Sequence, residues 1–258
     1  MPDRSAIGKN KQVKPSRCYV DSRPMTPESA CCCGVQARFG DCCGSVAPDR
    51  DPPRQLNVIP GFLPAAERNQ LLRFAQKQKR KWLTMVDLKK STAAKNVQIR
   101  DPGRVTQAVN MTRRDARLQQ IFRQALVEQI APVYGHRPAL FEPPYVLRYP
   151  PGGKYVLHSD GEEFDEQAQR WYRLRDRDVS LLIYLNDNYE GGWLSFDKLN
   201  YTYQPKAGDL VFFPSNHYYS HQSLPIKSGI KWAIVSWSSF AHTPKVSTGM
   251  EGWNTLTV

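Results

Sequence analysis

The sequence predicts a mainly β fold with flanking helices, an α+β arrangement whose core is a sandwich or barrel. Short runs rich in β-branched and aromatic residues recur, each bounded by Gly, Pro, Asn or Asp, at 145–149, 154–160, 179–186, 190–196, 205–214 and 231–237. Strands at such short intervals are typical of sandwiches and barrels. A hydrophobic fraction of 40% in 258 residues supports one substantial domain plus an appendage.

Two helices are expected ahead of most of these strands. The first follows a short strand that begins near residue 57 and starts close to Pro64, with Leu71, Leu72 and Ala75 on one face. The second spans about 115–133 and carries one apolar stripe, formed by Leu118, Ile121, Phe122, Ala125 and Ile130. We expect both helices to cover a sheet face that would otherwise be exposed.

Three residues of the strand region form a candidate metal site. His158 and Asp160 are two residues apart, so on an extended strand both side chains project to one side. His221 lies on another predicted strand. Two histidines and one carboxylate make the open facial ligand set that suits a non-haem Fe(II) oxygenase. His217 is the rival third ligand, but a loop or substrate-side role is favoured for it.

Several motifs surround these residues in a fixed order. YLN and then GG occur within 184–192, PK-x-GD and FFP within 205–214, and His221 is followed by Pro-Ile and Gly-x-Lys within 225–231. Over about 141–240 the chain resembles the prolyl 4-hydroxylase-like branch of the Fe(II)/2-oxoglutarate dioxygenases. The resemblance implies a double-stranded β-helix, or jelly-roll, whose open end holds the iron.

By this resemblance, the iron ligands are His158, Asp160 and His221. Lys231, ten residues after His221, corresponds to the basic residue that binds the distal carboxylate of 2-oxoglutarate. The chemistry is consistent with that role, because an unpaired carboxylate in a dry pocket is costly unless a fixed cation faces it. An ordinary surface lysine is the alternative, although core-type residues surround Lys231 in the sequence.

Three aromatic residues complete the expected site. Tyr184 and Tyr149 correspond to positions that face the co-substrate, and Trp237 corresponds to an aromatic residue near the iron; for Tyr184 a plain core position is the alternative. The implied reaction consumes O2 and 2-oxoglutarate, releases succinate and CO2, and hydroxylates a substrate. Ascorbate is a further expected cofactor. Whether the reaction requires it does not follow from the sequence.

All six cysteines lie before residue 44. A C-x-C-x8-C-C pattern that resembles the SEC-C motif, a small zinc-binding knuckle, is formed by Cys31, Cys33, Cys42 and Cys43. Four thiolates around Zn2+ make a closed structural site, and so small a module depends on its metal to fold. The alternative is a disordered or disulfide-linked tail, which the dense clustering disfavours.

The expected organisation has five parts: a disordered basic tail at 1–25, the knuckle at 26–46, a Pro-rich charged linker at 47–55, the dioxygenase domain at 56–241 and a C-terminal tail at 242–258. The core of the dioxygenase domain is expected at 141–240. Next to the ligands, the segment 161–178 changes from acidic to basic. It is expected to form a lid or groove wall, or else a solvated excursion.

Charge and hydropathy limit the kinds of partner that the chain is expected to bind. The formal net charge of +12 raises the question of nucleic acid, but the basic residues are scattered without an aromatic platform, so nucleic acid is not favoured. No apolar run approaches the roughly 18 residues that a membrane span needs, and a cytoplasmic protein without a membrane partner is expected. Nothing in the sequence indicates the oligomeric state.

Three functional hypotheses follow. The favoured one is a hydroxylase of a polypeptide, most simply of a prolyl residue, to which the zinc knuckle would recruit the enzyme. The second is a hydroxylase of a free amino acid or a natural-product intermediate. The third is a binding protein with a vestigial metal site, which the intact ligands and Lys231 disfavour.

Overall fold

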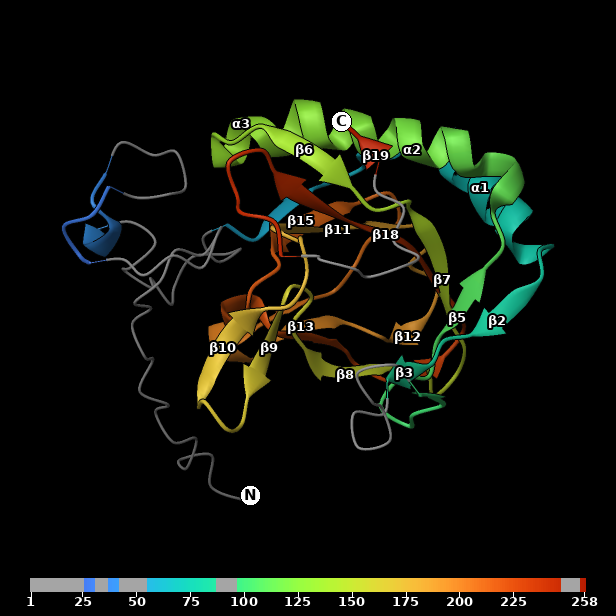
Figure 1. Cartoon of the computed structure of the whole chain (residues 1–258). Coiled ribbons are helices and arrows are strands. Elements are labelled where there is room, and N and C mark those ends of the chain that lie inside the picture. Colours follow the sequence, from blue (N-terminus) through green and yellow to red (C-terminus); the bar gives the residue numbers. More distant parts are fainter. Residues whose placement is uncertain (1–25, 31–36, 42–54, 87–96, 247–255) are drawn as a thin grey trace, which may run out of the picture.

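Two antiparallel sheets face each other, and helices cover the outer side of the larger sheet (Figure 1). The computed structural model describes residues 26–30, 37–41, 55–86, 97–246 and 256–258. The larger sheet contains, in order across it, β1 (Asn57–Ile59), β15 (Leu210–Pro214), β11 (Val179–Tyr184), β18 (Lys231–Phe240), β7 (Tyr145–Tyr149), β5 (Gln107–Val109) and β2 (Arg80–Trp82), with β6 (Pro138–Phe141) beside β18 and β19 (Leu256–Thr257) beside β6. The smaller sheet has the order β14 (Tyr201–Tyr203), β13 (Leu194–Phe196), β16 (His221–Ser223) and β8 (Tyr155–His158). The predicted jelly-roll is confirmed.

Shorter elements connect these sheets. Three two-stranded ribbons are formed by β3 (Met85–Val86) with β4 (Gln98–Ile99), β9 (Glu162–Asp165) with β10 (Arg170–Arg173), and β12 (Glu190–Gly191) with β17 (Ile226–Ser228). Single 3-10 turns occur at η1 (Phe39–Asp41), η2 (Thr112–Arg114), η4 (Asp197–Leu199) and η5 (His217–Tyr219). The segment that was expected to be a lid or a solvated excursion therefore contains the β9–β10 hairpin.

The helical layer agrees with the apolar stripe in the sequence. Helix α1 (Ala65–Gln76) begins directly after Pro64, and α2 (Asp115–Gln124) continues through a π-helical segment, η3 (Ala125–Ile130), into α3 (Ala131–Tyr134). Gly135 adopts a left-handed conformation with φ of 65° and ends this run, as glycine does at many helix C-termini. The predicted second helix is confirmed over its whole length, although its middle part is π-helical.

Strand β18 separates the two parts of the core. Residues at alternate positions of a strand point to opposite faces of the sheet. Trp232 and Ile234 pack in the cluster that contains the buried helix residues Leu118 and Phe122, and the alternate positions, among them Val235, face the space between the sheets. Burying each large apolar side chain contributes about 1.5–3 kcal/mol. The helical layer therefore fixes the sheet whose other face carries the candidate site.

None of the described helices is both long and apolar enough to cross a bilayer.

Candidate metal centre and adjoining pocket

The three candidate ligands meet at one edge of the smaller sheet. Strands β8 and β16 pair antiparallel with His158 directly opposite His221, and Asp160 follows β8 by two residues. The Nε2 atom of His158 lies 3.5 Å from Oδ1 of Asp160, and Nε2 of His221 lies 3.6 Å from Oδ2. One ligand atom from each residue lies within 4.8 Å of the other two. A single divalent cation fits among them.

Hydrogen bonds fix both imidazoles in the orientation that ligation needs. Nδ1 of His158 lies 2.8 Å from the carbonyl oxygen of Val156, and Nδ1 of His221 lies 3.1 Å from that of Tyr219. A backbone carbonyl can only accept, so each Nδ1 carries the proton and each Nε2 presents a lone pair toward Asp160. This is the tautomer that a metal-binding histidine requires.

The protonation states also suit a cation. Burial lowers the pKa of His221 to about 4, so its imidazole is neutral at pH 7. Burial alone would raise the pKa of Asp160, but His221, His158 and Arg177 outweigh it and hold that pKa well below its usual value. A neutral imidazole at His221 and a carboxylate at Asp160 are the forms that bind a divalent metal.

A second layer of contacts orients Asp160. The hydroxyl of Ser180, on β11, donates to Oδ2 of Asp160 at 2.7 Å. Arg177 donates to the backbone carbonyl of Asp160 at 3.1 Å while forming a two-pronged ion pair with Glu142. The Arg177 guanidinium also lies 3.7 Å from the ring centroid of Trp237. The carboxylate is therefore fixed from both its side chain and its backbone.

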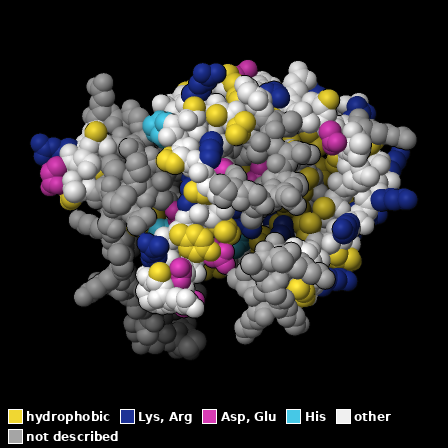
Figure 2. Space-filling model, viewed as in Figure 1, with side chains coloured by type: hydrophobic (Ala, Val, Ile, Leu, Met, Phe, Trp, Pro, Cys, Tyr) yellow, Lys and Arg dark blue, Asp and Glu magenta, His cyan; other side chains and the backbone are white. Residues whose placement is uncertain are grey.

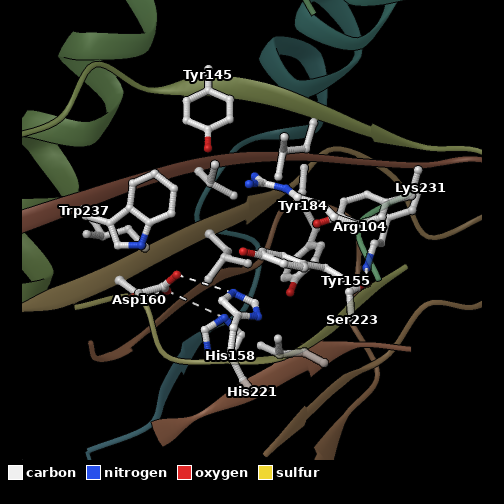
Figure 3. A pocket seen from close by; sticks show the side chains of 18 residues that line it. Arg104, Tyr145, Tyr155, His158, Asp160, Tyr184, His221, Ser223, Lys231 and Trp237 are labelled. Carbon is white, nitrogen blue, oxygen red and sulfur yellow. Dashed lines mark hydrogen bonds and ion pairs between the residues drawn. The ribbon is translucent and has the colours of Figure 1, made fainter. Parts of the chain in front are cut away.

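A pocket opens beside the three ligands and contains every predicted co-substrate residue (Figure 3). Its empty volume, including the open mouth, is about 590 Å3. The pocket is lined by Arg104, Tyr145, Leu147, Tyr149, Tyr155, His158, Asp160, Ser180, Leu181, Leu182, Tyr184, Leu194, His221, Ser223, Lys231, Ala233, Val235 and Trp237. Apart from the ligands themselves, only Arg104 and Lys231 in this set ionise near neutral pH or carry a permanent charge.

Lys231 is a buried cation at one end of the pocket. Its side chain is 3% exposed, and its Nζ donates to the carbonyl of Gly192 at 2.7 Å and to the hydroxyl of Ser223. Because Lys231 and Tyr149 are paired across β18 and β7, Nζ also lies 4.3 Å from the Tyr149 ring centroid. Burial lowers the pKa of Lys231 to about 7. Among the described residues no carboxylate forms an ion pair with this ammonium, so it can accept one from a ligand.

The structure thus brings together all seven residues that the sequence suggested for iron and co-substrate. The rival ligand His217 lies elsewhere: its Nδ1 contacts the carboxylate of Glu162 at 2.5 Å, and its ring stacks on Trp171 at 4.6 Å. The four predicted zinc ligands, Cys31, Cys33, Cys42 and Cys43, lie outside the described residues.

Five other polar or aromatic lining residues were missed by the sequence reasoning: Arg104, Tyr145, Tyr155, Ser180 and Ser223. Ser180 and Ser223 could have been found, because they lie an even number of residues from Tyr184 and His221 and so share their faces. Tyr155, whose ring stacks on His158 at 3.7 Å, lies on the same strand as that ligand. Arg104 precedes the region of resemblance and carried no signal.

Comparisons with known proteins agree with this geometry. Residues 144–239 match the model of the 2OG-Fe(II) oxygenase superfamily, and this segment contains the three candidate ligands and Lys231.

Two curated relatives are similar to part of the chain. A protein of Acanthamoeba polyphaga mimivirus, assigned as a prolyl 4-hydroxylase, is 37% identical over 102 residues, covering 36% of this chain and 42% of its own length. A PKHD-type hydroxylase of Thermosynechococcus vestitus is 33% identical over 105 residues, covering 39% of this chain and 44% of its own length. The aligned region spans less than half of either relative.

Among solved structures, the viral collagen prolyl hydroxylase of Paramecium Bursaria Chlorella virus-1 in complex with 2OG aligns over 72% of this chain and 96% of its own. The sequence identity is 20% and the TM-score is 0.49.

Proposed function

We propose that this chain is an Fe(II)- and 2-oxoglutarate-dependent dioxygenase of the prolyl 4-hydroxylase type that hydroxylates a peptidyl, most simply prolyl, substrate. One observation supports this most strongly: the two-histidine, one-carboxylate set and the unpaired ammonium of Lys231 line the same pocket, within a segment that matches the 2OG-Fe(II) oxygenase superfamily. A binding protein with a vestigial site would have no need of both features.

The residues present fit the implied groups. His158, Asp160 and His221 would hold Fe(II) through the three atoms that converge within 4.8 Å, leaving the opposite face of the metal for other ligands. When bound, iron and 2-oxoglutarate supply the oxidising chemistry that consumes O2, releases succinate and CO2, and delivers one oxygen atom to the substrate.

The protein's own task at the co-substrate end is binding. Lys231 would pair with the distal carboxylate of 2-oxoglutarate, and the Ser223 hydroxyl that already contacts Nζ would complete the polar end. Burial raises the pKa of Tyr184 well above its usual value, so its hydroxyl stays protonated and can donate to the same carboxylate. Tyr149 holds the ammonium from its ring face. These contacts orient the co-substrate and exclude water from it.

The opposite end of the pocket suits a peptide substrate. Figure 3 shows Trp237 and Asp160 at one end and Lys231 at the other, with His158 and His221 between them. No described residue within 161–178 lines the pocket. The β9–β10 hairpin therefore does not seal the pocket, and an open mouth favours a polypeptide over a free amino acid. The name of the mimivirus relative, a prolyl 4-hydroxylase, supports a prolyl target.

The domain division and the zinc knuckle belong to this proposal. The knuckle at 26–46 would bind Zn2+ through Cys31, Cys33, Cys42 and Cys43 and recruit the substrate. Support comes from the described residues beside these cysteines: the amide of Phe39 donates to the carbonyl of Ser29 at 2.6 Å, and the amide of Gly40 donates to that of Pro27 at 2.8 Å. These bonds hold two short segments together that flank the cysteines. A requirement for ascorbate and a cytoplasmic location are further parts of the proposal.

The distribution of basic side chains on the surface bears on nucleic acid, the partner that the sequence disfavours. On the face shown, Lys and Arg side chains are scattered among other residues and form no continuous patch. That pattern is typical of a solvated surface.

Mass spectrometry tests the proposal. A size-fractionated host lysate is treated with the purified protein, Fe(II) and 2-oxoglutarate, and compared with the same treatment by a His158→Ala variant. One-oxygen additions on prolyl residues of particular polypeptides, present only with the wild type, are expected. Additions confined to the small-molecule fraction would replace the peptidyl substrate with a metabolite. No additions in either fraction, and no succinate, would refute the enzymatic function.

A further inference from the structure

Arg104 is a second cation in the pocket, and the proposed reaction leaves it without a role. It lies in the loop between β4 and β5 and reaches into the pocket between Tyr145 and Tyr155 (Figure 3). Residues 103–105 pair with residues 154–156: the amide of Val105 donates to the carbonyl of Lys154 at 2.9 Å, and that of Val156 to Gly103 at 2.9 Å. Arg104 and Tyr155 are therefore directly opposite, and their side chains share a face.

The guanidinium of Arg104 lies over the ring of Tyr155, which in turn stacks on the candidate ligand His158. Its central carbon lies 4.5 Å from the ring centroid of Tyr155, and the same ring stacks on His158 at 3.7 Å. Two hydrogen bonds to Asp101 fix the loop. The amide of Arg104 donates to the carbonyl of Asp101 at 3.0 Å, and the amide of Gly103 donates to the Asp101 side chain at 2.6 Å. The position of the cation is thus determined by backbone pairing rather than by a flexible surface stem.

The charge of Arg104 has no acidic partner among the described residues. Its Nε is shielded from solvent and makes no hydrogen bond there. Two arginines of the segment 161–178 differ, because Arg173 pairs with Asp178 at 2.7 Å and the buried Arg177 pairs with Glu142. A guanidinium partly withdrawn from water without a carboxylate is costly. The ring face of Tyr155 and a side-chain hydrogen bond with Tyr145 compensate for only part of that cost.

The proposed reaction does not supply the missing partner. The only acidic lining residue, Asp160, would ligate iron, and the distal carboxylate of 2-oxoglutarate would pair with Lys231. The remaining carboxylate of 2-oxoglutarate would bind the metal. With every other formal charge among the lining residues balanced in this way, one positive charge remains at Arg104.

We propose that Arg104 binds a carboxylate of the substrate, so that the enzyme selects a target residue that carries, or lies next to, a carboxylate group. The proposal rests on the dioxygenase function proposed above and narrows its substrate class. Such a carboxylate has three sources: the C-terminus of a polypeptide that ends in proline, an acidic side chain beside an internal proline, and the α-carboxylate of free proline. The planar fork of arginine suits two-pronged binding of any of these.

The test compares matched substrate pairs that differ only in charge. One pair is a short peptide ending in proline, as the free acid and as the amide; the other is a peptide with an internal proline followed by Glu or by Gln. Free L-proline completes the set. Binding is measured by calorimetry with the Fe(II)- and 2-oxoglutarate-loaded protein under nitrogen, and turnover by one-oxygen addition in air. The variants are Arg104→Met, Arg104→Lys and, as a matched control, Arg100→Met.

Arg100 suits the control because it is exposed, lies four residues away and stacks on Trp82 outside the pocket lining. We expect the wild type to bind one charged probe about tenfold or more tightly than its neutral partner, since a charge-assisted pair contributes about 1.5–3 kcal/mol. Arg104→Met should reduce that ratio to about one and leave the KM for 2-oxoglutarate unchanged, whereas Arg100→Met should keep the ratio. Because the ratio is taken within each variant, a general folding defect cannot imitate this result.

Three results would overturn the inference. The first is equal binding of the members of both pairs by the wild type, with no affinity for free proline. The second is a charge preference that Arg104→Met retains. The third is a raised KM for 2-oxoglutarate in Arg104→Met, which would assign Arg104 to the co-substrate. In each case prolyl turnover would still support the proposed function. If the wild type neither bound nor hydroxylated any probe, the inference and the prolyl substrate would fall together.

Discussion

Replacing Lys231 by methionine removes a charge from the pocket and keeps much of the side-chain volume. The ammonium makes two hydrogen bonds, to Gly192 and Ser223, and forms no ion pair with a described carboxylate. If it binds the distal carboxylate of 2-oxoglutarate, the lost charge-assisted bond contributes about 1.5–3 kcal/mol, which corresponds to a roughly 10- to 150-fold higher KM. The expected change is therefore in KM for 2-oxoglutarate, with a smaller effect on kcat.

The pH dependence sharpens this prediction. Burial lowers the pKa of Lys231 from its ordinary 10.5 to about 7, so the ammonium is charged below pH 7 and loses its proton as the pH rises. At pH 8 only about one in ten free enzyme molecules would carry the charge, so the wild-type KM for 2-oxoglutarate should be about tenfold higher than at pH 6. The KM of Lys231→Met should stay flat, and the difference between the two enzymes should shrink with rising pH.

Stability should change in a related way. A lysine whose folded pKa is lowered costs stability wherever the unfolded chain is protonated, fully so below pH 7, and this cost declines between pH 7 and pH 10.5. The wild type should gain stability over that range, and Lys231→Met should not.

The assay measures succinate formation against 2-oxoglutarate concentration at several pH values. Lys227→Met is the control, because Lys227 is on the neighbouring strand with a side chain that is 70% exposed. An unchanged KM in Lys231→Met, or an equal rise in Lys227→Met, would refute the assignment of Lys231 to the co-substrate.

Three further predictions concern other parts of the molecule. Ser180→Ala should weaken Fe(II) binding about 10- to 100-fold, because the hydroxyl that orients Asp160 is lost, and metal titration would show no change if that bond were unimportant. Leu118→Ala should lower the free energy of unfolding by about 2–5 kcal/mol, since Leu118 is completely buried on the inner face of α2. Chemical denaturation would test this, and a loss below about 1 kcal/mol would contradict the packing. Cys42→Ser should abolish zinc binding and leave succinate formation with a short peptide largely intact, and an equal loss of both would contradict the two-module organisation.

The sequence was sufficient to predict those residues that a periodic pattern or a motif identifies. The resemblance assigned Lys231 and Trp237 to the site, and the spacing of His158 and Asp160 predicted that both ligands project to one side. Each of these residues lines the pocket. The stripe that contains Leu118 also located the buried helix face. In all of these cases the interacting positions are close in the sequence, or a motif marks them.

The missed features depend on contacts between distant segments. Arg104 enters the pocket because its backbone pairs with Tyr155, about fifty residues later, and no local pattern encodes that pairing. The contact of Arg177 with both Glu142 and Asp160 likewise requires three segments to meet. The π-helical segment at 125–130 was also not predicted, because its apolar spacing is compatible with an ordinary α-helix. Such features follow from the assembled sheets rather than from any one stretch of sequence.

The most direct test of the central claim follows labelled oxygen through the reaction in wild-type, His158→Ala and His217→Gln proteins. The enzyme is supplied with isotopically labelled O2, Fe(II), 2-oxoglutarate and the polypeptide identified from lysate. We predict one labelled atom in succinate and one in the hydroxylated product for the wild type and for His217→Gln, whose histidine lies outside the ligand set, and neither product for His158→Ala. Labelled products from His158→Ala, or their loss only in His217→Gln, would contradict the account.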